Sequence, residues 1–282
     1  MRKSVLFMLV LLSSACSSSV WAWGAADTQV EPYCVYTPEG HRMDVKNLCC
    51  ISAIEGYRWI VVYSPHPDDE TLGLGATINY YKRMGFKIMV VLLTHGEKSV
   101  SREILCDTYG FCFSEKEFGL FRVEEFKAAV MTLGAYYVIY DYGDQNLKEE
   151  IVQKIILYYD KRLDVAYHFV PAVEKWYNLD HAVTALALEN VHVRGNKAQF
   201  GIYAFYYTVN IHGGIIFHTD AEDVIAKRDA LYQYRYWNPA KRRYAIGYLT
   251  FPELWDLLYS KCEFEIILII IDENPSLRSS VT

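Results

Sequence analysis

Short apolar runs and amphipathic stretches alternate through the middle of the chain. The apolar runs predict buried strands at residues 59–63, 87–93, 136–140, 164–170 and 200–207. The stretches between them have helical periodicity, at residues 71–84, 115–133, 147–162 and 180–191. This alternation predicts βαβ units, and therefore an α/β fold with a Rossmann-like, mainly parallel sheet flanked by helices.

The C-terminal part of the chain is less regular. We expect a returning hairpin at residues 208–218, a helix at 221–236 and a late strand at 264–271. Ligands of open parallel sheets bind beyond the carboxyl ends of the strands. Functional residues are therefore expected in the loops that follow the predicted strands.

The N-terminus has the features of a targeting segment. Arg2 and Lys3 precede an apolar run at residues 5–12, and Val20-Trp21-Ala22 fits a small-x-small cleavage site. We expect residues 1–22 to be a signal peptide and the protein to be exported, periplasmic or secreted. A membrane anchor that stays attached and a lipoprotein linked through Cys16 are alternatives. No other segment predicts a transmembrane span.

Composition narrows the number of domains and the kinds of partner that the chain can have. The chain has 282 residues, 52% of them hydrophobic, and no compositional break divides it. We expect one domain at residues 58–282, preceded by a cysteine-bearing extension at residues 23–57. The net charge is -6 and no stripe of Lys and Arg is present, which argues against a nucleic-acid partner. No pattern predicts an oligomeric state.

The cysteine count supports export. Beyond Cys16 there are six cysteines, an even number that suggests disulfides in an exported chain: Cys34, Cys49, Cys50, Cys106, Cys112 and Cys262. Cys106 and Cys112 flank a short loop and are predicted to pair. Cys34 is predicted to pair with Cys49 or Cys50, and the remaining one with Cys262. The alternative, a structural zinc cluster, lacks a C-x-x-C pair.

The loop after the first predicted strand contains a histidine followed by three acids. His66 and Asp69 are three residues apart on a tight turn and can face one ion, while Asp68 is free to act as a base. One Asp would suffice to cap the following helix. Three consecutive acids repel one another unless a cation lies among them, so the segment predicts a zinc site.

A third zinc ligand must come from another loop. His181 is the best candidate, because it follows the strand at 164–170, opens a helix and has an acidic neighbour. His95 and His168 are competitors, His212 and His218 lie in the irregular region, and His41 and His192 have the character of surface residues.

These motifs resemble the LmbE-like (PIG-L) zinc de-N-acetylases, which remove acetyl from N-acetylglucosamine units and related amides. The matching segments are Pro65 to Glu70, Thr94 to Glu97, Arg122 to Glu125 with Leu133-Gly134, Asp144, and Lys227 to Leu231. The resemblance implies zinc as cofactor and an N-acetylated sugar or glycan as substrate. It implies these roles: zinc ligands His66, Asp69 and His181, general base Asp68, and sugar contacts Arg122 and Asp144.

One position departs from the family pattern. The distal motif of the family is usually H-x-D-H, and this chain has Asn178 where the first histidine stands. An amide can donate a hydrogen bond to an oxyanion but cannot protonate a leaving amine. His168, His95 or Asp68 could supply that proton. Alternatively, the chain is a zinc-containing sugar-binding protein with little or no turnover.

An aromatic pair precedes the distal motif. Trp176 and Tyr177 lie in a predicted loop rather than inside an element. A flat ring can stack on the apolar face of a pyranose, so we predict that Trp176 forms part of a sugar platform. Packing in the protein interior is the alternative for either ring.

Overall fold

The structure, a computed structural model, describes residues 34–44, 58–173, 178–202, 215–218, 220–260 and 264–270. Its strands are β1 (Val35–Tyr36), β2 (Arg42–Met43), β3 (Trp59–Ser64), β4 (Lys87–Leu92), β5 (Tyr136–Ile139), β6 (Val165–Pro171), β7 (Asn196–Phe200), β8 (Ile215–His218), β9 (Trp237–Asn238), β10 (Arg243–Tyr244) and β11 (Phe264–Ile270). Its helices are α2 (Asp69–Arg83), α3 (Ser101–Tyr109), α4 (Glu115–Leu133), α5 (Glu149–Arg162), α6 (Leu179–Glu189), α7 (Ala221–Arg235), the 3-10 turn η1 (Pro239–Lys241), α8 (Ile246–Thr250) and α9 (Pro252–Ser260).

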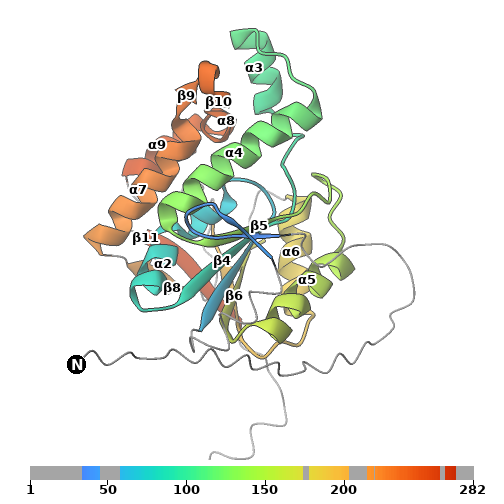
Figure 1. Ribbon diagram of the computed structural model, residues 1–282, viewed down its shortest axis with the longest axis vertical. Coiled ribbons are helices and arrows are strands. Elements are labelled where there is room, and N and C mark those ends of the chain that lie inside the picture. Colours follow the sequence, from blue (N-terminus) through green and yellow to red (C-terminus); the bar gives the residue numbers. More distant parts are fainter. Residues whose placement is uncertain are drawn as a thin grey trace, which may run out of the picture.

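A nine-stranded sheet forms the centre of the molecule (Figure 1). Its strand order is β2-β1-β5-β4-β3-β6-β7-β11-β8. The pairs from β5 to β7 are parallel, and the strands at both edges are antiparallel. The chain leaves the central β3 in both directions, to β4 and later to β6, which makes a topological switch point beside the end of β3. The predicted α/β fold with a mainly parallel sheet is confirmed.

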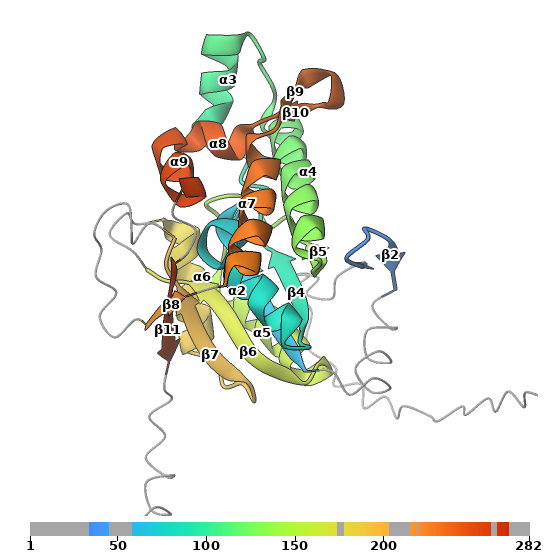
Figure 2. The same cartoon turned by 90° about the vertical axis from the view of Figure 1, so that its left-hand side faces the viewer.

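Helices cover both faces of the sheet, with α2, α4 and α7 on one and α5 and α6 on the other (Figures 1 and 2). Successive side chains of a strand point to opposite faces. Ile60 and Val62 therefore pack with the first group of helices, and Val61 and Tyr63 pack with the second. Because helices cover both faces of the sheet, every residue of β3 is buried. This is why its sequence is almost entirely apolar.

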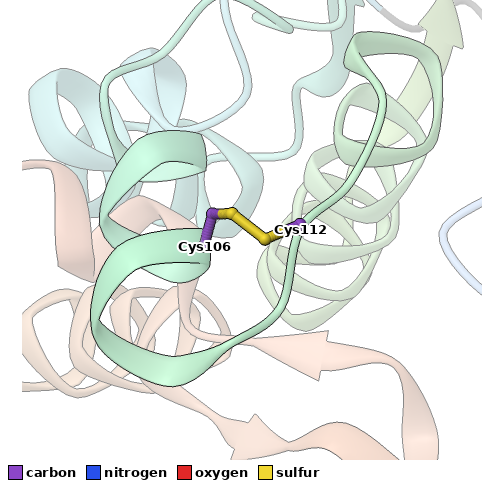
Figure 3. Close-up of a disulfide and its surroundings, with 2 residues drawn as sticks. All are labelled: Cys106 and Cys112. Atoms are coloured by element: carbon purple, nitrogen blue, oxygen red, sulfur yellow. A yellow bond between two sulfur atoms is a disulfide. The ribbon is translucent and has the colours of Figure 1, made fainter.

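A smaller group of elements projects beyond the sheet at the top of Figure 1. It comprises α3, the first turns of α4, the β9–β10 hairpin and α8, around a small core of Leu105, Phe118, Tyr244 and Ile246. A disulfide joins Cys106 in α3 to Cys112 in the loop before α4 (Figure 3). The predicted pairing of these two cysteines is confirmed.

Several sequence expectations differ from the structure. The strand β7 covers Asn196–Phe200 and so precedes the predicted run at 200–207, and α3 was not predicted. Part of the N-terminal extension joins the sheet, because β1 pairs with both β2 and β5. Cys34 is free among the described residues, and its predicted partners lie outside them. Within the described ranges, no helix is both long and apolar enough to cross a membrane.

Candidate metal centre

The three predicted zinc ligands lie close together at the carboxyl ends of β3 and β6. Asp69 Oδ2 lies 3.3 Å from His66 Nδ1 and 3.2 Å from His181 Nε2. The two imidazole rings are 5.2 Å apart between centroids. His66 and Asp69 come from the turn after β3, and His181 lies in the first turn of α6. All three side chains are buried, and one ligand atom from each lies within 4.8 Å of the others.

The other nitrogen of His66 faces two further carboxylates. His66 Nε2 lies 3.2 Å from Asp180 Oδ2 and 3.3 Å from Asp144 Oδ1. A second group of candidate ligands is therefore His66, Asp144 and Asp180. A histidine that binds a metal commonly donates its second N–H to a carboxylate, which fixes the ring orientation and its tautomer. With Nδ1 toward Asp69 and His181, Asp144 and Asp180 fit this supporting role.

The electrostatic environment of the cluster favours positive charge. Burial alone would lower the pKa of His66, but hydrogen bonds to Asp144, Asp180 and Asp69 raise this pKa well above its ordinary value. Burial would raise the pKa of Asp69, and the neighbouring His181 and His66 lower it instead. Two imidazole nitrogens and one carboxylate, converging on one point, are a donor set suited to a zinc ion.

Asp68 occupies an unusual backbone position between the strand and the helix. Its φ of 117° lies in the region that residues other than glycine rarely adopt. Its side chain makes no capping hydrogen bond to α2, so simple N-capping does not account for the residue. Burial raises the pKa of Asp68 to about 8, although Arg122 acts in the opposite direction. A strained, buried carboxyl beside a candidate metal centre is the arrangement expected of a functional group.

The carboxylate of Glu70 holds this turn together. Its Oε2 accepts hydrogen bonds from Ser64 Oγ at 3.1 Å and from the Asp68 N–H at 3.3 Å. Its Oε1 accepts from Thr71 Oγ1 at 2.6 Å and from Tyr234 Oη at 2.8 Å. A strained backbone persists only where several contacts hold it, and these four hydrogen bonds to one carboxylate do so.

Arg122 reaches the same turn from α4. Its Nη2 donates to Pro67 O at 2.7 Å and to Asp68 Oδ2 at 3.0 Å, and its Nη1 donates to Gly96 O at 2.7 Å. Gly96 has φ +63°, and a Cβ there would lie 2.1 Å from Arg122 Nη1, so only glycine fits. The guanidinium is buried and engaged by the protein itself, so the sugar contact predicted for Arg122 stays a prediction.

The distal loop positions His181 through a cap. Asn178 is the N-cap of α6, and its Oδ1 accepts hydrogen bonds from the N–H groups of Asp180 and His181. These bonds use the carbonyl oxygen of the side chain, while the amide nitrogen is the group that could serve an oxyanion. Trp176, the predicted sugar platform, lies outside the described residues.

Two other histidines were candidates for the site. His168 lies inside the sheet, with Nδ1 3.0 Å from Tyr63 Oη and Nε2 3.1 Å from Asp160 Oδ1. It is fully buried there, away from the turn that carries His66, and burial lowers its pKa. His95 lies 3.5 Å from Asp141 and lines a cavity of about 430 Å³. Glu97 lines this cavity too, and its Oε1 accepts the N–H of Asp144, so the cavity adjoins the candidate metal centre.

Sequence reasoning missed two supporting residues. Asp180 was noted as the acidic neighbour of His181, but its contacts with His66 and with the N–H groups of Gln145 and Leu147 were not foreseen. Tyr234 on α7 is not among the residues predicted from the sequence. Neither carries a local signal, because each acts on a partner more than 30 residues away.

A known protein family matches the part of the chain that contains these residues. Residues 61–192 match the family model described as PIG-L, GlcNAc-PI de-N-acetylase. Residues 61–192 belong to the PIG-L family. The matched segment of the PIG-L domain holds His66, Asp69 and His181 together with Asp68, Arg122 and Asp144.

A curated relative matches this chain over a shorter stretch. The 1D-myo-inositol 2-acetamido-2-deoxy-alpha-D-glucopyranoside deacetylase of Acidothermus cellulolyticus is 33% identical over 79 residues. The alignment covers 27% of this chain and 26% of the relative, so the matched segment spans about a quarter of that protein's length.

Solved structures share the fold over most of the chain. The A40926 pseudoaglycone deacetylase superposes with a TM-score of 0.56 at 18% identity, covering 76% of this chain and 98% of its own. The 4-carboxy-2-hydroxymuconate hydratase of Pseudomonas putida KT2440 also superposes with a TM-score of 0.56, at 17% identity. The superposition covers 77% of this chain and 98% of the hydratase. The second protein is a hydratase, so the fold by itself does not decide the reaction.

Proposed function

We propose that this chain is an exported zinc-dependent hydrolase that removes acetyl groups from N-acetylglucosamine-type sugars or glycoconjugates. The single observation that carries the proposal is the convergence of His66, Asp69 and His181 beside the strained turn at Asp68. The PIG-L match and the named deacetylase relatives support the choice of an N-acetyl sugar as substrate.

The side chains of the candidate metal centre have two roles, to hold the metal and to orient one of its ligands. His66, Asp69 and His181 would hold the zinc, with Asp144 and Asp180 keeping the His66 ring in orientation. A zinc ion in such a site polarises the acetyl carbonyl and lowers the pKa of water. The buried turn keeps these groups close without rearrangement, which suits a preorganised site.

Asp68 is the residue we assign to proton transfer. Its carboxylate takes a proton from the attacking water, and the water oxygen forms the new bond to the acetyl carbon. The bond from that carbon to nitrogen then breaks, and the proton passes to the leaving amine, which gives acetate and the free amino sugar. Arg122 and Glu70 hold Asp68 in place through its side chain and its N–H, respectively. The side-chain amide of Asn178 can donate a hydrogen bond to the oxyanion that forms after the water attacks and before the carbon–nitrogen bond breaks.

Export is supported by two independent features. The basic start at Arg2 and Lys3 and the following apolar run have the pattern of a signal peptide. The disulfide between Cys106 and Cys112 suits an oxidising compartment. We therefore place the substrate outside the cytoplasm, as a surface polysaccharide, a cell-wall fragment or a scavenged amino sugar.

The second candidate function is a zinc-containing sugar-binding protein with little or no turnover. The observation that favours it is Asn178, which caps α6 through its carbonyl oxygen and carries no group able to protonate an amine. Binding of an N-acetyl sugar would then persist without release of acetate.

Release of acetate separates the two functions. Purified protein loaded with zinc is incubated with N-acetylglucosamine, its short oligomers and N-acetylglucosaminyl glycoconjugates, and acetate is measured. We expect release by the natural chain and at least a hundredfold less by Asp68→Asn with its zinc retained. Binding of these sugars with no acetate above the metal-free control would overturn the enzyme proposal in favour of the binding protein.

A further inference from the structure

A cavity of about 700 Å³ lies along the outer side of α4. Its walls come from two parts of the chain, α4 and the segment around the β9–β10 hairpin. None of its lining residues belongs to the candidate metal centre. The volume lies within the range of sites that bind small molecules.

The lining of this cavity is positively charged. Lys127, Lys241 and Arg243 face one carboxylate, Glu124, which leaves an excess of two positive charges (three minus one). Glu124 is already paired with Lys127, at 2.6 Å between Oε1 and Nζ. The whole chain has a net charge of -6, so positive charge collects here against the general trend. A concave positive surface attracts anionic ligands and focuses the field on them.

Arg243 is held in position for such a ligand. One of its terminal nitrogens donates to the carbonyl oxygen of Gln233, and its Cζ lies 5.5 Å from the centre of the Tyr236 ring. Among the described residues, its Nε is buried and has no hydrogen-bond partner. With Nε buried and one terminal nitrogen bound to Gln233, the remaining terminal N–H groups of Arg243 are those that can donate to a carboxylate or phosphate in the cavity.

The remaining wall is suited to a ring. Tyr236 and the side chain of Met131 border the cavity, and Tyr236 Oη accepts a hydrogen bond from Asn238 Nδ2 at 2.9 Å, which fixes the aromatic ring. An aromatic face beside polar groups is a common platform for a pyranose. We propose that this cavity is a second binding site, for a saccharide that carries a carboxylate or phosphate group, with the anion at Lys241 and Arg243 and the sugar ring at Tyr236.

Two adjacent residues give a matched test. Lys241 and Arg242 are both exposed and both positively charged, but only Lys241 lines the cavity. Calorimetry with glucuronic acid and glucosamine 6-phosphate is run on the chelator-treated natural chain, Lys241→Glu and Arg242→Glu, with glucose and inorganic phosphate as reference ligands. Chelation keeps the result independent of the proposed deacetylase activity. Thermal unfolding confirms that each variant is folded.

We expect saturable binding of both charged sugars and at least tenfold weaker binding of each reference ligand. Lys241→Glu should weaken binding of the charged sugars at least tenfold, and Arg242→Glu less than twofold. Equal losses in the two variants would show general attraction to the surface and overturn the site. No saturable binding by the natural chain would overturn it too. Inorganic phosphate that binds as tightly as glucosamine 6-phosphate would overturn recognition of the sugar.

Discussion

Arg122 Nη2 lies 3.0 Å from Asp68 Oδ2 and also donates to Pro67 O. Both side chains are buried, so this ion pair joins α4 to the strained turn at the end of β3. A buried cation beside a carboxylate favours its ionised form, whereas burial of Asp68 opposes it. The position and the proton affinity of the proposed base therefore depend on a helix more than 50 residues away.

The first prediction concerns this pair. In Arg122→Lys the ammonium keeps the charge but cannot reach Gly96 O, Pro67 O and Asp68 with the geometry of a guanidinium. We expect kcat for acetate release to fall by about 10- to 100-fold, as for other residues that hold a functional group, with little change in KM and in zinc content. A rise in KM with unchanged kcat would instead support the sugar contact implied by the family resemblance. Arg102→Lys, at a part-exposed surface pair, is the control.

The second prediction concerns the metal ligands. Replacement of His66, Asp69 or His181 by Ala removes one of three donors that converge on one point, so each variant should lose zinc during purification. Zinc content by mass spectrometry, per mole of folded protein, checks this. His192→Ala, at an exposed histidine, should retain zinc like the natural chain. Full zinc occupancy in His181→Ala would contradict the ligand assignment.

The third prediction concerns the disulfide. Cys106 and Cys112 close a loop with a sequence separation of 6 in the projecting group of elements. Constraint of the unfolded chain by so short a loop contributes about 2 kcal/mol. The double variant Cys106→Ser with Cys112→Ser should lose roughly this much unfolding free energy in urea. Peptide mapping of unreduced natural protein that found free thiols at both positions would contradict the pairing.

The fourth prediction concerns pH. Glu125 accepts hydrogen bonds from the N–H groups of Ile246 and Gly247, and burial raises its pKa to about 7. The folded state therefore binds more protons than the unfolded state between about pH 4.3 and 7, so stability falls as pH rises through this window. The slope from this one group is at most about 1.4 kcal/mol of unfolding free energy per pH unit.

Glu125→Gln removes this titration. In urea unfolding with a chelator present, the variant should lack the downward contribution between pH 5 and 7, even if it is less stable overall. The buried ion pair between Lys227 on α7 and Glu265 on β11 is unchanged in this variant. Parallel stability profiles for the natural chain and the variant would show that Glu125 is ionised throughout the window.

The fifth prediction concerns Trp176, which stands two positions before Asn178 in the sequence. If its ring stacks on the sugar, Trp176→Ala should weaken substrate binding while zinc content and melting temperature stay nearly unchanged. A large fall in melting temperature with unaltered substrate affinity would instead identify Trp176 as part of the core. Titration of a non-hydrolysable N-acetyl sugar analogue measures the affinity.

Local sequence predicted the regular part of the fold well. The helix α4 begins and ends at the predicted residues, since Ser114 and Glu117 form a capping box and Gly134 adopts the left-handed conformation at the other end. The strand β7 was misplaced because Lys197 and Gln199 do not form an apolar pattern. Both side chains can be buried because hydrogen bonds to Glu189, at the end of α6, satisfy their polar ends. The helix α3 is short and buries only Ser101 and Leu105, so it lacks the long apolar stripe of a helix that packs on the sheet.

The sequence by itself determined the chemistry available at the centre: an imidazole and acidic side chains at the end of the first buried strand, and a second imidazole at the start of a later helix. Their types and their places in the βαβ order were enough to predict that His66, Asp69 and His181 meet. Only the tertiary structure decided which carboxylates face His66 Nε2 and that Arg122 holds Asp68. Those contacts join residues far apart in the chain, and packing of helices on the sheet sets their distances, which no local pattern encodes.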